Sequence, residues 1–151
     1  MGERQLVLFE LEDTRYALDI AAVESIEAGL GAAPLPGLPE PFAGVASLHG
    51  RPLPVIDMRL QVGLPPLTAG DATRVVVVTV GKRRMGLMVD RVSVVARVQT
   101  GAIRPFPASV LGKMLPFVTN VVQMPDGLVF LVDVARLLPA GQKSMAAGAG
   151  R

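Results

Sequence analysis

The chain has 151 residues, of which 50% are hydrophobic and 4% aromatic, and its formal net charge is +2. This length accommodates one domain or a pair of small ones, and the apolar content excludes a disordered chain. With no Cys and a single His, His49, the sequence excludes disulfides, thiolate metal sites, a cysteine nucleophile and a His-rich zinc site.

The charge is distributed unevenly along the chain. Residues 1–73 hold four Arg against ten Asp or Glu, whereas residues 74–151 hold eleven Lys or Arg against three Asp or Glu. This pattern favours two solvated faces of unlike sign, and it leaves open contacts with similar modules or with an anionic partner. Nucleic acid is not expected as that partner, because the basic run at 82–84 is short and lacks interleaved aromatic residues.

Short β-like runs punctuated by Gly, Pro and Asp predict a mainly β protein of the barrel or sandwich type. The Pro-rich segment 29–41 is expected to be a stiff surface connection, and the Gly- and Ala-rich segment 139–151 a disordered tail. In chain order, the expected strands are 5–11, 14–18, 42–48, 52–56, 74–80, 84–89, 92–98, 117–124 and 128–132.

Two of these strands run into an Asp followed by a short helical stretch. Asp57 and Asp133 stand at these points. Since Asp is a preferred N-cap, we expect both to be structural caps, each contributing about 0.5 to 2 kcal/mol.

The chain also contains an internal repeat. Residues 6–23 resemble residues 75–92 at an offset of 69, and the two capped segments are related by an offset of 76. The repeat predicts two similar units, about 6–64 and 74–138, each closing on itself as a small barrel with a groove between the two.

The sequence offers no catalytic constellation. It has no Gly-rich phosphate loop and no nucleophile elbow, and the acidic residues at strand ends, such as Asp19 and Asp90, are explained by caps and turns. We therefore expect a non-enzymatic protein without a metal or other cofactor. The N-terminal residues lack a signal pattern and no apolar run reaches 18 residues, so we expect a cytoplasmic protein that does not insert into a membrane.

Several motifs in order resemble the CheW family of chemotaxis coupling proteins. The opening hairpin (6–11 and 16–20) is similar to that of the family, and VESI at 23–26 is similar to the segment that follows it. FAGVASLHG at 42–50 resembles the family pattern I-x-G-V-x-N-L-R-G, and PVIDMR at 54–59 resembles P-V-x-D-L-R. MGLMVDRV at 85–92 and IRP at 103–105 also match, so the resemblance extends from about residue 6 to 138.

The resemblance implies two small five-stranded, SH3-like barrels in one domain spanning 1–138. It also implies a cytoplasmic adaptor, associated with membrane receptor arrays, that couples the cytoplasmic tip of methyl-accepting chemoreceptors to the regulatory domain of a CheA-type histidine kinase. Other CheW-like modules are further possible partners. In the family, the receptor tip docks between the barrels. The partner-binding residues that this implies here are Val23, Ile26, Gly44, His49, Gly50, Gly86 and Val92.

Two residues depart from the family pattern. His49 replaces the Arg of N-L-R-G, and Ser25 replaces a frequent acidic residue. We expect His49 on the surface, at a hairpin tip beside the inter-barrel groove. Both changes favour a chemosensory pathway other than the flagellar one. The alternatives left open are a CheW-like module that binds only receptor or only kinase and limits signalling, and a small basic barrel that binds nucleic acid.

Overall fold

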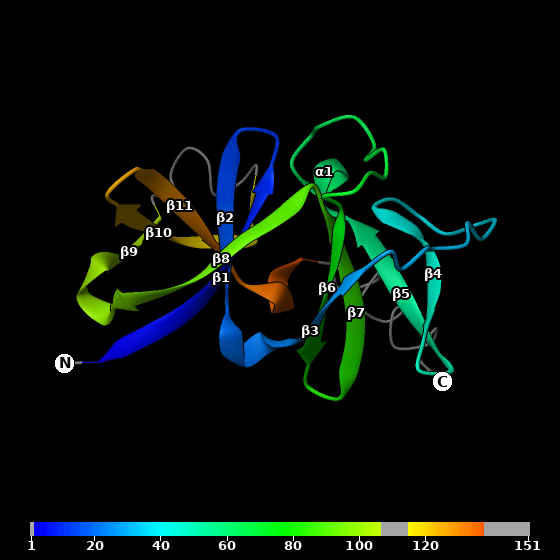
Figure 1. Ribbon diagram of the computed structural model, residues 1–151, viewed down its shortest axis with the longest axis horizontal. Helices are drawn as coiled ribbons and strands as arrows, with labels where there is room; N and C mark the ends of the chain where they lie inside the picture. Colours follow the sequence, from blue (N-terminus) through cyan, green and yellow to red (C-terminus); the bar gives the residue numbers. More distant parts are fainter. Residues whose placement is uncertain (1, 107–114, 138–151) are drawn as a thin grey trace.

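A computed structural model of the chain describes residues 2–106 and 115–137 (Figure 1). Within these residues the protein consists almost entirely of β-strands in two sheets, which confirms the expected fold class. No helix in the described ranges is long and apolar enough to cross a membrane. The tail expected at 139–151 lies outside the described residues.

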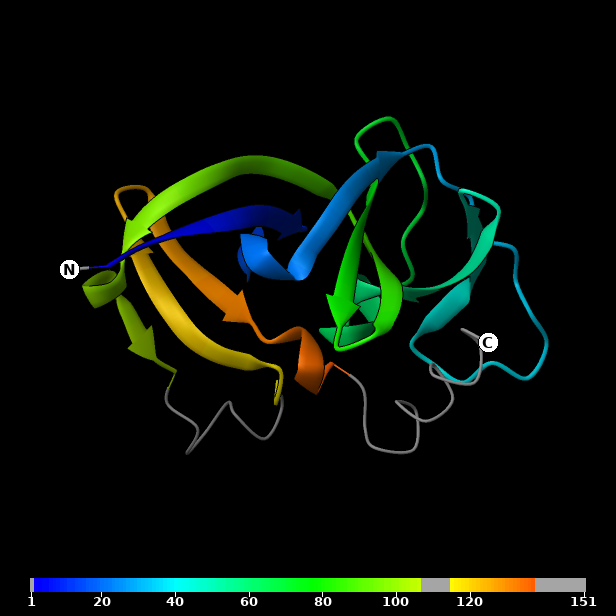
Figure 2. The same ribbon diagram turned by 90° about the horizontal axis from the view of Figure 1, so that it is seen from below.

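The two sheets curl into two small barrels that pack side by side (Figures 1 and 2). The larger sheet has six strands, in the order β8 (Arg91–Gln99), β1 (Glu3–Leu11), β2 (Thr14–Asp19), β11 (Gly127–Val132), β10 (Val118–Met124) and β9 (Ile103–Pro105). The smaller sheet has five, in the order β3 (Val23–Ala28), β6 (Arg74–Val80), β7 (Arg83–Val89), β5 (Arg51–Asp57) and β4 (Phe42–Leu48). Four short helices lie between or after the strands in the described ranges: η1 (Ile20–Ala22), α1 (Met58–Gln61), η2 (Thr100–Ala102) and η3 (Val134–Arg136).

All nine expected strands are present, with bounds that differ by at most two residues. Two further strands, β3 and β9, were not predicted. β3 contains two Glu among six residues, and β9 has three residues and ends in Pro, so neither carries a strong β pattern. The connection 29–41 forms no strand, as expected, but Ala33 makes an isolated bridge to Val45 with N···O distances of 2.9 and 3.0 Å.

The internal repeat is visible in the structure. β4 and β5 recur 76 residues later as β10 and β11, and β1, β2 and β3 recur about 69 residues later as β6, β7 and β8. The strand order of the smaller sheet therefore repeats that of the larger one, with the Ala33 bridge in the place of β9.

The two repeat units do not close on themselves, contrary to expectation. The smaller barrel is the continuous segment 23–89, whereas the larger barrel combines β1 and β2 with β8 to β11. Each unit thus gives its first hairpin to the barrel of the other unit, through the parallel pairs β2–β11 and β5–β7. The exchange is caused by the short connection that follows each hairpin. After β2, η1 leads the chain into β3 of the smaller sheet, and after β7, Asp90 alone precedes β8 of the larger sheet.

The apolar residues form three cores. One core fills the larger barrel, a second fills the smaller barrel, and the third, which includes Phe9 and Met58, lies between the barrels and draws on both sheets. β6 contains four consecutive Val because both of its faces are buried: Val75 and Val77 face the interior of its own barrel, while Val76 and Val78 face the shared core. A strand buried on both faces loses the polar alternation of a surface strand.

The exchange of hairpins also mixes the acidic and basic parts of the chain. Several residues of the acidic part pair with residues of the basic part. The pairs are Arg84–Glu24 (2.6 Å), Arg59–Asp90 (2.6 Å), Arg15–Asp126 (2.9 Å) and Arg91–Glu10 (3.7 Å). These ion pairs compensate part of the charge asymmetry of the sequence.

Asp19 is expected to make stability depend on pH below about 4. Its carboxylate accepts from the Ala21 N–H at 3.0 Å and from Arg4 Nε at 2.9 Å. Burial raises the pKa of Asp19, but these hydrogen bonds and the charge of Arg4 outweigh it and hold the pKa below the ordinary value of 3.8. The unfolded chain therefore takes up a proton first as the pH falls, so this stability is present above pH 4 and is lost towards lower pH.

Urea denaturation between pH 6 and 2.5 measures this contribution. Because Asp19 is about a third exposed, we expect Asp19→Asn to lower the free energy of unfolding by at most about 1 kcal/mol at pH 6, with a difference that shrinks as the pH falls below about 4. A difference between the two proteins that stays constant over this range contradicts this origin.

Candidate functional site

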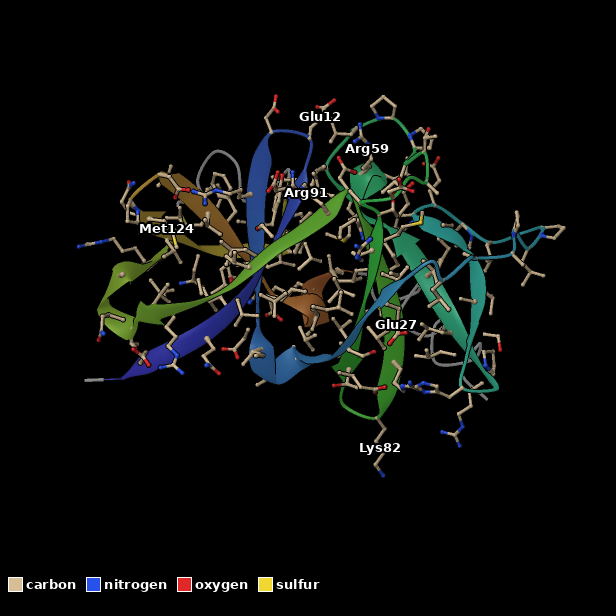
Figure 3. All side chains as sticks on the ribbon, viewed as in Figure 1. Glu12, Glu27, Arg59, Lys82, Arg91 and Met124 are labelled. Carbon is tan, nitrogen blue, oxygen red and sulfur yellow. The ribbon has the colours of Figure 1, made fainter. Side chains whose placement is uncertain are left out.

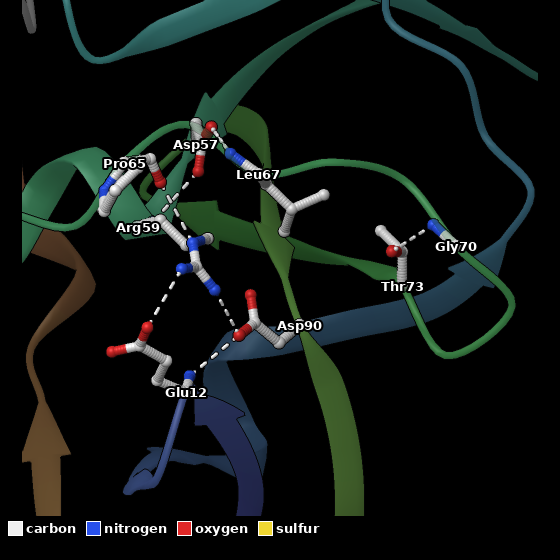
Figure 4. Close-up of polar contacts among 8 residues, drawn as sticks. All are labelled: Glu12, Asp57, Arg59, Pro65, Leu67, Gly70, Thr73 and Asp90. Atoms are coloured by element: carbon white, nitrogen blue, oxygen red, sulfur yellow. Dashed lines mark hydrogen bonds and ion pairs between the residues drawn. The ribbon is translucent and has the colours of Figure 1, made fainter.

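Asp57 and Asp133 stand at equivalent places in the repeat and act as N-caps. Asp57 Oδ1 accepts from the Arg59 N–H at 3.0 Å at the start of α1, and Asp133 Oδ1 accepts from the Ala135 N–H at 3.0 Å at the start of η3. Asp57 makes a second hydrogen bond, in which its Oδ2 accepts from the Leu67 N–H at 2.8 Å (Figure 4). Asp57 is also buried, with an exposed fraction of 3%. This second bond ties the β5–β6 connection to the barrel.

The three glycines among the expected partner-binding residues have backbone roles. Gly50 occupies the β4–β5 turn with φ of 76°. Gly86 is buried in β7, where a Cβ atom would lie 2.6 Å from Val75 Cγ1. Gly44 has a φ of 154°, and a Cβ atom there would lie 2.3 Å from the backbone oxygen of Ala33. Close packing inside the smaller barrel therefore explains Gly44 and Gly86.

His49 lies at the tip of the β4–β5 hairpin, is exposed and has a φ of 52°. Its expected place beside the inter-barrel groove was wrong. β4 is the edge strand of the smaller sheet, and Figures 1 and 2 show the β4–β5 hairpin on the side of the molecule away from the six-stranded sheet. The sequence could identify the turn but not the order of strands that carries it away from the junction.

The other departure from the family pattern lies inside the protein. Ser25 is opposite Val77 on the inward face of β3, and its Oγ is buried without a hydrogen-bond partner. Ser25 stands where the family pattern often has an acidic residue, so this departure alters the interior of the smaller barrel.

Val23, Ile26 and Val92 belong to β3 and β8, the strands at one edge of each sheet. Val23 and Val92 are half-buried and pack against the shared core, whereas Ile26 is 39% exposed. Only Ile26 of the three is thus clearly available to a partner.

β8 adds two exposed residues that the sequence did not single out. Val94 is 54% exposed and Val95 is 52% exposed. β3 and β8 lie on the same side of the molecule in both views (Figures 1 and 2). We use the name aliphatic patch for three exposed side chains on the edge strands of the two sheets, Ile26, Val94 and Val95. Two consecutive Val on an edge strand are the signal that could have indicated it, because consecutive strand residues point to opposite faces and cannot both be buried in one core.

A polar contact joins the two barrels at one end of their junction. Arg59, at the end of the smaller barrel, donates from Nη1 to Asp90 Oδ2 at 2.6 Å, and the same oxygen accepts from the Glu12 N–H of the larger barrel at 2.7 Å (Figure 4). Figure 3 shows Glu12, Arg59 and Arg91 near one another here, and Lys82 at the opposite end of the smaller barrel. The contact fixes the β1–β2 turn, in which Glu12 has a φ of 55°.

A family model and individual known proteins both match nearly the whole chain. The family model described as CheW-like domain matches residues 5–142. The chain is 28% identical to the chemotaxis protein CheW of Rhizobium meliloti (strain 1021) over 145 residues, which cover 96% of this chain and 94% of that protein. It is 28% identical to the chemotaxis protein CheW of Bacillus subtilis (strain 168), with 91% of this chain and 87% of that protein covered.

The crystal structure of the scaffolding protein TtCheW from Thermoanaerobacter tengcongensis has the same fold. It superimposes with a TM-score of 0.78 at 24% identity, covering 87% of this chain and 90% of that chain. With the family model matching most of the sequence and relatives of similar length, the chain belongs to the CheW-like domain family.

Proposed function

We propose that this protein is a non-enzymatic scaffold that couples the cytoplasmic tip of methyl-accepting chemoreceptors to a CheA-type histidine kinase. The observation that carries the proposal is the family match over residues 5–142, together with relatives of nearly equal length that are named as chemotaxis proteins. A small protein of two packed barrels suits this role, because it offers several separate surfaces on one rigid body. Its place of action would be the cytoplasmic side of the receptor array.

The aliphatic patch supports a specific docking surface for the receptor tip. Ile26, Val94 and Val95 expose apolar surface on edge strands of both barrels. Exposed apolar residues grouped on one side of a protein mark interaction sites more often than isolated ones do. The apolar face of a receptor helix could cover these side chains and gain affinity from the area removed from water.

The patch is tested by two charge substitutions, Ile26→Glu and Val95→Glu. We expect each to weaken binding of a receptor cytoplasmic fragment by about tenfold or more, because a buried unpaired carboxylate opposes docking. Binding of the kinase regulatory domain should stay within about twofold. Leu128→Glu is the matched control, since Leu128 is 49% exposed but lies on β11 beside a turn of the larger barrel.

Co-sedimentation with each partner separately decides between a coupling scaffold and a module that binds only one partner. Binding of both receptor fragment and kinase domain supports the coupling role. Binding of one alone supports a protein that limits signalling, and equal loss of receptor binding in Leu128→Glu argues against the patch.

We further propose a chemosensory pathway other than the flagellar one. The support is His49, an exposed imidazole where the family pattern has Arg. Because an imidazole lacks the planar five-donor fork of a guanidinium, this turn offers a partner fewer hydrogen-bond donors than the family Arg would.

A further inference from the structure

The smaller barrel is open at the end where the connections after β3 and β5 meet. A hollow of about 530 Å³ lies there, within the size range of small-molecule sites. Its walls are mostly apolar, and several of the lining residues are the half-buried rim of the core inside this barrel: Leu30, Ala32, Ala43 and Met88.

The wall contributed by the β5–β6 connection is held by specific hydrogen bonds (Figure 4). Leu67 donates its N–H to the buried Asp57 carboxylate, and the Gly70 N–H donates to Thr73 Oγ1 at 2.9 Å. Arg74 donates from Nη1 to the carbonyl oxygens of Asp71 and Thr73 at 2.7 and 2.8 Å. The mouth is therefore a built feature, and the Asp57 carboxylate and Arg74 Nη1 already have partners.

Glu27 supplies an acidic group to this hollow, and its carboxylate has no partner among the residues that the structure describes. It lies opposite Val75 on the inward face of β3, is half-buried and lines the hollow (Figure 3). No hydrogen bond or ion pair of its carboxylate is found within the described ranges. A half-buried carboxylate without a partner favours the approach of a cation.

The larger barrel provides an internal comparison. At the place of Glu27 it has Ala96, which is opposite Leu6 as Glu27 is opposite Val75. At the place of Met88 it has Asp19, which is already paired with Arg4. The hollow at this end of the larger barrel is only about 240 Å³. The same fold thus has a smaller mouth lined by the Arg4–Asp19 ion pair and a larger mouth lined mostly by apolar residues, with Glu27 beside them.

We propose that the mouth of the smaller barrel binds a small aliphatic ammonium ion. The alkyl chain would lie against Ala43, Leu67 and Met88, and the ammonium group would contact the Glu27 carboxylate. This binding site is separate from the coupling role and from the aliphatic patch: Glu27 faces inward on β3, whereas its neighbour Ile26 faces out.

Calorimetric titration of the full chain with n-hexylammonium, hexanoate and 1-hexanol tests the proposal. We expect hexylammonium to bind with a Kd of roughly millimolar order, as suits so small a ligand, and the other two at least tenfold more weakly. Glu27→Gln should reduce hexylammonium affinity about tenfold and abolish its advantage over hexanol. NMR shifts should map to the lining residues.

A second pair of variants tests the apolar wall. Ala43→Leu should fill the mouth and abolish binding, whereas Thr119→Leu, at the equivalent place of the larger barrel, should leave affinity within about twofold. Equal binding of hexanoate, unchanged affinity in Glu27→Gln, or shifts confined to other residues would overturn the site. Because no receptor or kinase is present in these titrations, a negative result leaves the coupling role unaffected, and a positive result does not depend on it.

Discussion

Replacing Gly44 by Ala is expected to lower the free energy of unfolding by about 3 to 5 kcal/mol. The added Cβ would meet the Ala33 oxygen at 2.3 Å, and the residue would have to keep a φ of 154°. Relief of the clash requires the loss of the two backbone hydrogen bonds between Ala33 and Val45. Backbone strain of about 1 to 3 kcal/mol and about 1 kcal/mol for each lost bond together give the expected loss.

Two other glycines separate the contributions in urea denaturation. Gly37 has a φ of 87° and no atom within 4 Å of an added Cβ, so Gly37→Ala should lose only about 1 to 2 kcal/mol. Gly31 has neither a positive φ nor a close contact, so Gly31→Ala should be within about 0.5 kcal/mol of the original protein. A loss for Gly44→Ala no greater than that for Gly37→Ala would contradict the close approach of Ala33.

The second large effect is expected for Asp57→Ala, at about 3 to 4 kcal/mol. This substitution leaves the N–H groups of Arg59 and Leu67 without their acceptor in a buried environment. Hydrogen bonds to a charged group contribute about 1.5 to 3 kcal/mol each, so losing two exceeds the effect of a simple cap. Asp57→Asn, which keeps one carbonyl oxygen, should lose less.

Asp133→Ala is the matched control for this prediction. Asp133 caps η3 through one backbone hydrogen bond and is less buried, so its loss should stay at about 0.5 to 2 kcal/mol. Hydrogen exchange of the Leu67 amide should accelerate in Asp57→Ala and stay unchanged in Asp133→Ala. Equal losses of stability in the two variants, or an unchanged Leu67 exchange rate, would show that the second hydrogen bond of Asp57 has little energetic weight. Partner affinity of the folded variants should remain nearly unchanged.

Most strands could be predicted from the sequence because their signals are local. The turn at Gly81, for example, separates two apolar runs whose bounds the structure reproduces within a residue. β3 was missed because its inward-facing positions hold Ser25 and Glu27, which conceal the alternation that identifies a half-buried strand.

The pairing of the strands could not be predicted from the same signals. A hairpin pattern shows that β1 and β2 pair with each other, but nothing local shows that β2 continues to β11 and not to β3. The errors at the candidate site have the same cause. His49 was placed at the correct kind of turn but beside the wrong surface, and the Arg59–Asp90 contact joins residues whose proximity depends on the sheet order.

The exchange of hairpins also determines the order in which the barrels can be completed on the ribosome. β1 and β2 are synthesised first, but their neighbour β11 ends at Val132, more than 100 residues later. At about 5 to 20 residues per second, the first hairpin waits roughly 6 to 23 s for it. The segment 23–89 contains every strand of the smaller barrel. The larger barrel, which contains β1, is therefore the last to close, and it closes beside a smaller barrel that can already have formed.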